Sequence, residues 1–224
     1  MDTVRIFIQA RMSSSRFPGK MLAPFNGKPL VANVVERLAQ AGFGDRCVVV
    51  TSTDPTDDPL ADFVAHRLKV PVFRGDLHNV VSRFQGALEA FPAGWIVRIS
   101  GDSPVIDGEL VAAVVAHRTA ETDLVSNVVR RTFPAGQSVE CARAGALAVW
   151  DASKLNNVEK EHVTTHFYRN PTTYRIRSVV CRDPAAAQER HVVDTLHDLR
   201  MLERGVMIEP QLYSRFGPLA VLET

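Results

Sequence analysis

The chain has 224 residues, a formal net charge of +1, 46% hydrophobic residues and 23% charged residues. This is the composition of a globular protein with one sizeable core, and the near-neutral charge excludes the global basic field of nucleic-acid-binding proteins. No apolar run reaches the roughly 18 residues of a membrane helix, and the N-terminus lacks a signal-peptide pattern. Cys47, Cys141 and Cys181 are scattered without a CxxC pair. We therefore expect reduced thiols in a cytoplasmic protein with neither a membrane nor a nucleic-acid partner.

The first half of the chain alternates short apolar segments with helical repeats of apolar residues. Buried strands are predicted at residues 4–9, 47–51, 70–73, 95–99 and 124–127. Helices are predicted between them, at about 30–41, 60–68, 80–91 and 108–115. Asn26-Gly27 predicts a turn, Pro29 and Asp107 predict helix starts, and Gly42 predicts a helix end.

This alternation of strands and helices predicts an α/β fold with a mostly parallel sheet covered by helices on both faces. In such sheets, ligands bind beyond the carboxyl ends of the strands. The loops at 11–20 and 100–107 both follow predicted strands directly. We therefore expect them to meet at one edge of the sheet.

The pattern changes after about residue 128. Weak alternation and a break at Pro134 and Gly136 predict a hairpin or an arm over 129–142. Further elements are expected as helices at 147–150 and 163–168, strands at 173–180 and 192–194, a full helix at 196–202 and a short terminal helix at 210–216.

The segment Phe7 to Leu22, FIQARMSSSRFPGKML, carries the densest chemistry. Small residues let a backbone approach a ligand, and fixed cations supply charge-assisted hydrogen bonds, so this loop predicts a cradle for a polyphosphate. Its polar side chains are Arg11, Ser13, Ser14, Ser15, Arg16 and Lys20. It is not a Walker A loop, because Ser14 and Met21 stand where that motif has Gly and Ser or Thr. The alternative is an ordinary mobile basic loop.

Two aspartates are candidate magnesium ligands. Asp102 lies in SGDSP at the end of a predicted strand, where one or two carboxylates plus substrate phosphates would satisfy Mg²⁺. A turn aspartate is the alternative for Asp102. Asp194 precedes the last full helix, so it is either an N-cap or a metal ligand, and one carboxylate can do both.

The sequence leaves the roles of several other polar residues open. Arg98 lies inside a predicted buried strand and requires a carboxylate or a phosphate as partner. Arg83 is either a ligand-binding residue or solvated helix surface. His162 and His166 are four residues apart, on one face of a predicted helix, but the HExxH zinc motif is absent and a polar helix face is the better interpretation. The lack of a GxSxG elbow and of a neighbouring His argues against serine catalysis by Ser13, Ser14 or Ser15.

The motif QARMSSSRFPGKML resembles the N-terminal signature of the cytidylyltransferases that activate acidic sugars, in particular the SpsF-like branch involved in spore-coat polysaccharide. Five further segments resemble that branch in the same order: RGDLHNVVSRF (74–84), RISGDSPVID (98–107), FPAGQSVE (133–140), EKEHVTTHF (159–167) and RHVVDTLHDL (190–199). The resemblance covers nearly the whole chain. It implies a single domain over residues 1–224 with a three-layer α/β/α Rossmann-like fold, and transfer of cytidine monophosphate from CTP to an acidic sugar.

The resemblance also implies roles for individual residues. Arg11, Lys20, Asp102 and Asp194 would be catalytic, with Asp102 and Asp194 as Mg²⁺ ligands. CTP would be bound by Gln9, Ala10, Arg11, Ser13, Arg16, Lys20, Asp76, Arg83, Arg98 and Gly101. The acceptor sugar would contact Glu140, Glu161 and His162. Residues 129–170 would form an extension for a homodimer or for the acceptor site.

The chain departs from the branch at Ser103, where relatives usually have Cys, and at Leu196-His197, where they tend to have Pro-Glu. Neither departure removes a residue assigned to catalysis, and no residue stands out as a general base. The alternatives are a glycosyltransferase or another sugar nucleotidyltransferase of the same fold, or a non-catalytic nucleotide-binding subunit. The sequence defines neither the acceptor sugar nor the base preference.

Overall fold

The computed structural model describes residues 3–183, 185–206 and 219–223. Its first strand, β1 (Val4–Gln9), explains the α/β architecture from the sequence. Ile6 and Ile8 enter one hydrophobic core and Phe7 enters the other, because side chains alternate across a strand. A strand that is apolar on both faces needs helices on both sides, as in the interior of a parallel sheet.

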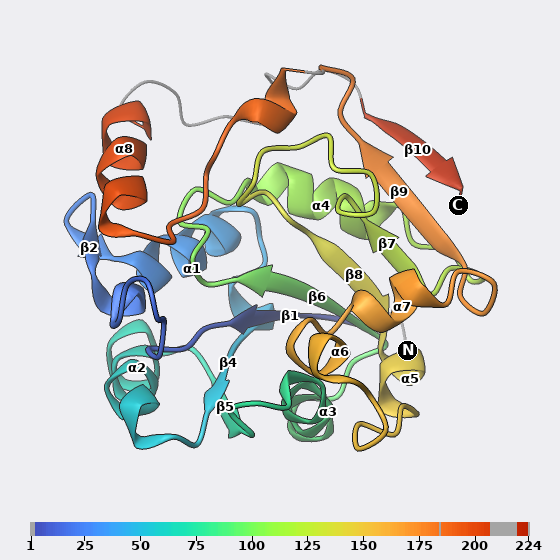
Figure 1. The fold of residues 1–224 in the computed structure, drawn as a ribbon, viewed down its shortest axis with the longest axis horizontal. Helices are drawn as coiled ribbons and strands as arrows, with labels where there is room; N and C mark the ends of the chain where they lie inside the picture. The colour runs from blue at the N-terminus through green and yellow to red at the C-terminus, as the bar shows by residue number, and fades with distance from the viewer. Residues whose placement is uncertain (1–2, 184, 207–218, 224) are drawn as a thin grey trace.

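One eight-stranded sheet forms the centre of the molecule, in the order β10-β9-β7-β8-β6-β1-β4-β5 (Figure 1). All its strands run in one direction except β8 and β10, which pair antiparallel with their neighbours. Its other members are β4 (Cys47–Ser52), β5 (Val72–Gly75), β6 (Trp95–Ser100), β7 (Leu124–Ser126), β8 (Glu140–Arg143), β9 (Ile176–Val180) and β10 (Ala220–Glu223). A separate small ribbon contains β2 (Pro24–Phe25) and β3 (Lys28–Pro29).

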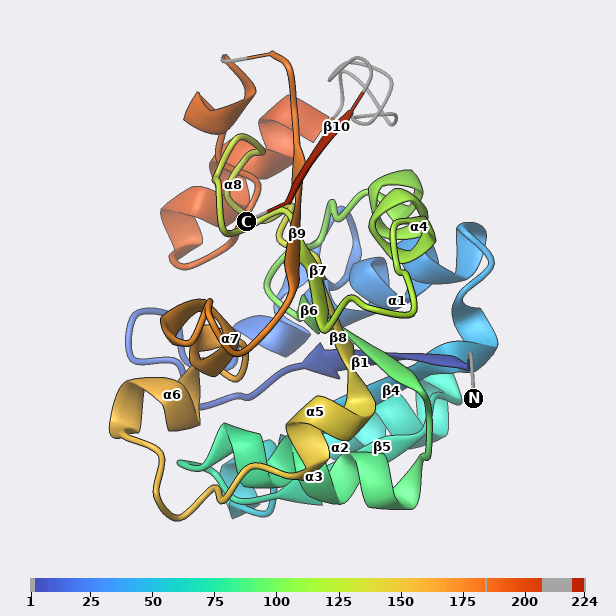
Figure 2. The same ribbon diagram turned by 90° about the vertical axis from the view of Figure 1, so that its right-hand side faces the viewer.

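Helices cover both faces, as the sequence predicts. One core joins the sheet to α1 (Leu30–Gln40), α2 (Asp58–Phe63), α4 (Gly108–Ala116) and α8 (Leu196–Val206). The other core joins it to α3 (Val80–Ala90), α5 (Ala144–Ala148) and α7 (Thr165–Arg169). Figure 2 shows α1 and α4 on one side of the sheet and α3 and α5 on the other. The mostly parallel three-layer fold is therefore confirmed.

Local signals in the first half give the expected elements. The turn at Asn26-Gly27 has positive φ at both residues, 49° and 78°, which is the geometry of a tight hairpin. Gly42 follows α1 with a φ of 82° and ends that helix. Asp107 caps α4 by accepting from the backbone N–H groups of Glu109 and Leu110.

The second half differs from its prediction. Residues 129–142 do not form a separate hairpin or arm, because Glu140–Arg143 is β8, a strand inside the main sheet that pairs antiparallel with β6 and with the preceding strand β7. The predicted strand at 192–194 is wrong, since this segment is a loop leading into α8. The predicted helix at 163–168 is preceded by a separate helix, α6 (Asn157–Glu161), and its own counterpart α7 begins at Thr165. The terminal helix predicted at 210–216 lies outside the described residues.

Small residues bring the ends of β1 and β6 together at the carboxyl edge. A Cβ added to Gly101 would lie 2.9 Å from the Cβ of Ala10 and 3.1 Å from the carbonyl oxygen of Gln9. The loops after these two strands therefore share one edge, as predicted. No helix in the described part of the chain is long and apolar enough to cross a membrane.

Candidate active site

The loop after β1 is folded back on itself and anchored at Met12. The Met12 carbonyl accepts from the N–H groups of Ser14 and Gly19, both at 2.9 Å. The Met12 N–H donates to the fully buried Asp57, which also accepts from Thr51 at 2.9 Å. Gly19 has a φ of 77°, which favours glycine, and turns the chain into a short helical segment that begins with Lys20.

Lys20 is the centre of the candidate site. Its side chain is only 7% exposed, yet its ammonium group lies 2.8 Å from Asp102 Oδ2 and 3.4 Å from Asp194 Oδ1. It also donates to the Val193 carbonyl at 2.8 Å. An ammonium group has three donors, so all three are used by protein acceptors. The structure thus brings together Lys20, Asp102 and Asp194 from segments far apart in the sequence.

Asp102 is held from two sides. Its Oδ1 accepts from the Ser100 hydroxyl at 2.6 Å, and its backbone carbonyl accepts from the Val193 N–H at 2.9 Å. This second bond joins the loop after β6 to the loop before α8. The carboxylate is 18% exposed and therefore reaches the surface of the site.

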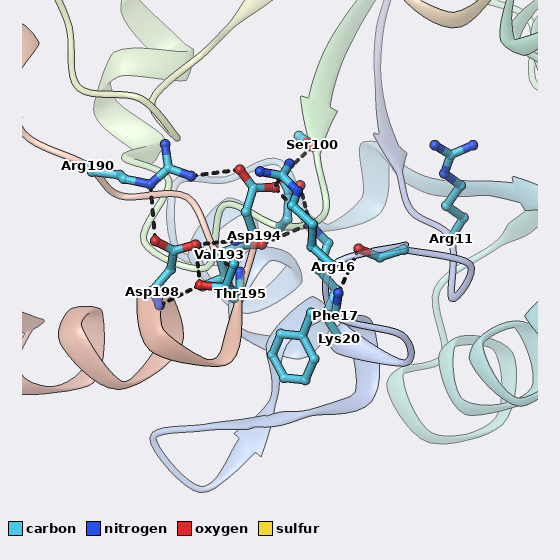
Figure 3. A network of polar contacts seen from close by, with 12 residues as sticks. Arg11, Arg16, Phe17, Lys20, Ser100, Arg190, Val193, Asp194, Thr195 and Asp198 are labelled. Carbon is cyan, nitrogen blue, oxygen red and sulfur yellow. Dashed lines mark hydrogen bonds and ion pairs between the residues drawn. The ribbon is translucent and has the colours of Figure 1, made fainter.

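Asp194 does not cap α8, so the N-cap interpretation is wrong. Thr195 precedes the first helical residue, and its hydroxyl accepts from the Asp198 N–H at 3.1 Å while Asp198 accepts from the Thr195 N–H at 2.8 Å. This reciprocal pair satisfies the helix start. Besides Lys20, the Asp194 carboxylate faces two further cations, Arg16 at 3.0 Å and Arg190 at 2.7 Å, which Figure 3 shows on either side of it.

Arg190 and Asp198 were missed as members of this network. Arg190 also pairs with Asp198 at 3.2 Å, and this hydrogen bond is the main reason that the pKa of Arg190 is raised. Burial raises the pKa of Asp198, but the bonds from Thr195 and Arg190 outweigh it and the pKa lies below its ordinary value. The sequence does carry a signal, because Thr195 and Asp198 have the spacing of a capping box.

A second polar cluster lies on the neighbouring strands. Arg98 has a carboxylate partner, as predicted from its place in a strand. Its Nη1 donates to Glu140 Oε2 at 2.5 Å, and its Nε donates to Gln9 Oε1 at 2.9 Å. Glu140 is almost fully buried, and its other oxygen accepts from the hydroxyls of Thr164 and Tyr168. The structure therefore places Glu140 behind Arg98, with both carboxylate oxygens bonded.

The remaining predicted residues lie around these clusters. Arg11 pairs with Glu161 at 3.2 Å, both half-exposed, and lies outside the Lys20 network (Figure 3). Ser13 is exposed on the loop. Asp76 accepts from the backbone N–H groups of His78 and Asn79, which lower its pKa. His162 is exposed at the end of α6, whereas His166 belongs to α7, so their placement on one helix face is wrong.

Arg83 is not solvated surface, because it is 1% exposed. Its three guanidinium nitrogens are buried and have no hydrogen-bond partner among the described residues. Burial and the charge of Arg11 lower the pKa of Arg83 to about 10, against the opposing charges of Asp57 and Asp76. A buried donor group without an acceptor is costly, and a ligand acceptor would satisfy it.

The donor set at Lys20 fits magnesium. No group of three or more His, Cys, Asp or Glu side chains that could hold a metal ion occurs in the described part of the chain. Two carboxylates do converge, Asp102 and Asp194, through their shared contact with Lys20. Mg²⁺ is typically held by one or two carboxylates and completes its coordination with phosphate oxygens and waters.

Comparison with known proteins gives the family of this chain. The cytidylyltransferase family model matches residues 6–209. The spore coat polysaccharide biosynthesis protein SpsF of Bacillus subtilis is 33% identical over 91% of this chain and 86% of its own length. A 3-deoxy-manno-octulosonate cytidylyltransferase of Mesorhizobium japonicum is 32% identical over 96% of this chain and 92% of its own. A solved cytidylyltransferase from Leptospira borgpetersenii superposes with a TM-score of 0.86 at 27% identity, covering 92% of this chain and 87% of its own.

Proposed function

Because the chain belongs to the cytidylyltransferase family, we propose that it transfers cytidine monophosphate from CTP to a hydroxyl of an acidic sugar and releases pyrophosphate. The curated relatives support this acceptor class, since 3-deoxy-manno-octulosonate is a sugar that carries a carboxylate. The product would be an activated sugar for surface polysaccharide or glycoconjugate synthesis, in keeping with the spore-coat relative.

One observation carries the proposal: Lys20 of the loop after β1 contacts both Asp102 and Asp194 at the carboxyl edge of the sheet. This arrangement combines a cation-rich loop for phosphates with two carboxylates for a divalent ion. Asp102 and Asp194 would hold Mg²⁺. When bound, the ion would neutralise charge on the phosphate oxygens and polarise the reacting phosphorus.

The cations of the site would divide the work of binding CTP. Arg16 and Arg11 are the more exposed and would reach the triphosphate by exchanging their present partners, Asp194 and Glu161. Lys20 would contact phosphate only by giving up one of its three acceptors. Arg83 would donate to the nucleotide and thereby satisfy its buried guanidinium. Gln9, Ala10, Ser13, Asp76 and Gly101 would complete the pocket.

The reaction would be an in-line displacement at the α-phosphorus of CTP. A new bond forms between the sugar oxygen and this phosphorus, the bond to the β-phosphate oxygen breaks, and pyrophosphate leaves. The hydroxyl proton passes to solvent, since no described side chain stands out as a general base. Catalysis would come from positioning and from stabilising the leaving charge with Arg11 and Lys20.

We also propose a cytoplasmic homodimer. The region 129–170, which the resemblance assigns to a dimer or acceptor-site extension, exposes three large apolar side chains, Val129 at 38%, Val149 at 80% and Val158 at 48%. The three cysteines of the chain, Cys47, Cys141 and Cys181, are buried thiols that form no disulfide, as expected in a reducing compartment. Sedimentation equilibrium of wild type and Val149→Asp would test the dimer.

Calorimetric titration with CTP, UTP, ATP and GTP, each with Mg²⁺, tests the function. We expect selective CTP binding that weakens in Asp102→Asn, followed by pyrophosphate release when an acidic sugar is added. Preference for another nucleotide would indicate a sister transferase of the same fold. Absence of binding to all four, with a folded protein, would favour a non-catalytic subunit.

A further inference from the structure

A row of polar side chains crosses one face of the sheet where the neighbouring positions are apolar. Arg98 on β6 lies opposite Glu140 on β8, and Glu140 lies opposite Ser126 on β7. Opposite residues on adjacent strands share a face. Tyr168 of α7 joins the row by bonding both Glu140 and Ser126. The row is thus covered by α7 at one end and opens at the other end, where Arg98 lies.

Arg98 is held as a fixed fork. Its Nε and Nη1 are bonded to Gln9 and Glu140, while its Nη2 makes no hydrogen bond to any described residue. The side chain remains 19% exposed, against 3% for Glu140. A guanidinium that is fixed by two neighbours and open at one nitrogen is arranged to receive a planar oxyanion from outside.

The position of Arg98 relates it to the reacting centre. Arg98 and Ser100 point to the same face of β6, about 7 Å apart along the strand, and the Ser100 hydroxyl bonds Asp102. In a 2-keto sugar acid, the anomeric carbon carries both the attacking hydroxyl and the carboxylate. The group that binds this carboxylate must therefore lie near the carboxylates at Lys20, and Arg98 is two strand positions from Ser100, which bonds one of them, Asp102.

The charge of Arg98 suits the acceptor better than the triphosphate. Glu140 already neutralises it at 2.5 Å, so the pair exerts little long-range attraction on a polyanion. Its directional donors remain, and these discriminate a carboxylate by geometry. The loop cations Arg11 and Arg16, in contrast, are exposed and have exchangeable partners.

We infer that Arg98 is the residue that binds the acceptor carboxylate, and that Glu140 and Gln9 are positioning residues that hold its guanidinium. The inference rests on the proposed function and deepens it, because it assigns the selection of an acidic acceptor to one side chain. It moves Arg98 from the CTP site to the acceptor site.

The test compares an acid with its uncharged isostere. Initial rates are measured with 3-deoxy-manno-octulosonate and with its C1 carboxamide, at saturating CTP and Mg²⁺. We expect wild type to prefer the acid by about 10- to 100-fold in kcat/KM, the range for a charge-assisted hydrogen bond. In Arg98→Gln this preference falls at least about tenfold, mainly through the KM for the acid, whereas the calorimetric Kd for CTP changes less than about threefold.

Two further variants distinguish a loss of carboxylate binding from a general disturbance of the fold. The double variant Arg98→Gln/Glu140→Gln removes both charges of the pair, so that no buried carboxylate is left uncompensated, and should show the same loss of preference. Arg143→Gln removes an arginine from the far end of β8, where Arg143 stacks on Trp95, and should keep the wild-type preference.

The outcomes separate this inference from the proposed function. If wild type turns over the acid and Arg98→Gln retains the full preference for acid over amide, the inference is overturned while the function stands. It is also overturned if Arg98→Gln raises the Kd for CTP as strongly as the KM for the acid. If wild type binds no CTP and turns over no acidic sugar, the proposed function itself fails and this inference with it.

Discussion

The two polar clusters at the carboxyl edge differ in where their residues come from. The Lys20 cluster is built mostly by loops: Asp102 and Asp194 lie in loops, and Lys20 begins the short helical segment that ends the loop after β1. The Arg98 cluster is built mostly on strands, with Arg98, Glu140 and Ser126 aligned by backbone pairing. Loops can shift to exchange one partner for another, whereas backbone pairing fixes the register of residues on adjacent strands. The first cluster therefore suits binding and release, and the second suits rigid selection.

The largest expected effect is a loss of turnover when a carboxylate of the loop-built cluster is replaced. Asp102→Asn should lower kcat by about 10³-fold or more, because it removes one of two carboxylates for the divalent ion. The fold should survive, since Lys20 keeps Asp194 and the Val193 carbonyl as partners. Pyrophosphate release measures the rate, and Asp62→Asn, an exposed aspartate paired with His66, is the matched control. Wild-type turnover in Asp102→Asn would contradict the assignment of Asp102 as a ligand of the divalent ion.

A substitution in the strand-built cluster should chiefly lower the free energy of unfolding. Glu140→Ala leaves Arg98 without its carboxylate, and breaking such a buried pair costs about 3–5 kcal/mol in the free energy of unfolding. Urea denaturation of wild type and variant measures this difference. A loss below about 1 kcal/mol, the range of exposed pairs, would mean that Arg98 is solvated and that the two clusters are alike.

Glu140 also makes the free energy of unfolding depend on pH. Burial raises the pKa of Glu140, but Arg98, Thr164 and Tyr168 lower it by more, so the pKa in the folded state lies below its ordinary value. Ionised Glu140 therefore contributes its full stabilisation above the unfolded pKa of about 4.3 and loses it as the pH falls through the folded pKa.

The difference in unfolding free energy between wild type and Glu140→Gln should accordingly narrow as the pH is lowered from about 5 to 3. Urea denaturation at a series of pH values gives this difference directly. A difference that stays constant over this range would show that Glu140 has the same pKa in both states.

The smallest effect is expected at the exposed pair that joins the loop to α6. Glu161→Gln should change the unfolding free energy by less than about 1 kcal/mol, because Arg11 and Glu161 are 39% and 52% exposed. It should tighten CTP binding by about two- to fivefold, since Arg11 no longer has to leave a carboxylate. Glu36→Gln, which breaks the exposed pair with Lys28, is the control. Weaker CTP binding in Glu161→Gln would argue that Glu161 itself contacts substrate.

Local sequence signals account for most of the first half of the fold. The apolar runs at 4–9 and 95–99 and the helical repeat at 30–38 are recognisable from residue type and spacing within one short segment, although the two strands take their backbone hydrogen bonds from neighbouring strands. β8 is not, because Glu140 is a carboxylate that no strand pattern favours and that is stabilised only by Arg98, Thr164 and Tyr168 from elsewhere. The expected strand at 192–194 fails for a related reason. Val193 lies in a loop and is buried, and its backbone carbonyl and N–H bond Lys20 and the Asp102 carbonyl instead of a neighbouring strand.

The sequence by itself determined the α/β class, the cation-rich loop after β1 and the candidacy of Lys20, Asp102 and Asp194, because periodicity and motif spacing are properties of neighbouring residues. Only the tertiary structure decided that Lys20 is buried between the two carboxylates, that Thr195 rather than Asp194 caps α8, and that Arg98 is held by Glu140. The first and third of these features join residues that are 42 to 174 positions apart, whereas the cap joins Thr195 to Asp198, three residues on. Their energies depend on burial and on partners that exist only once the chain has folded.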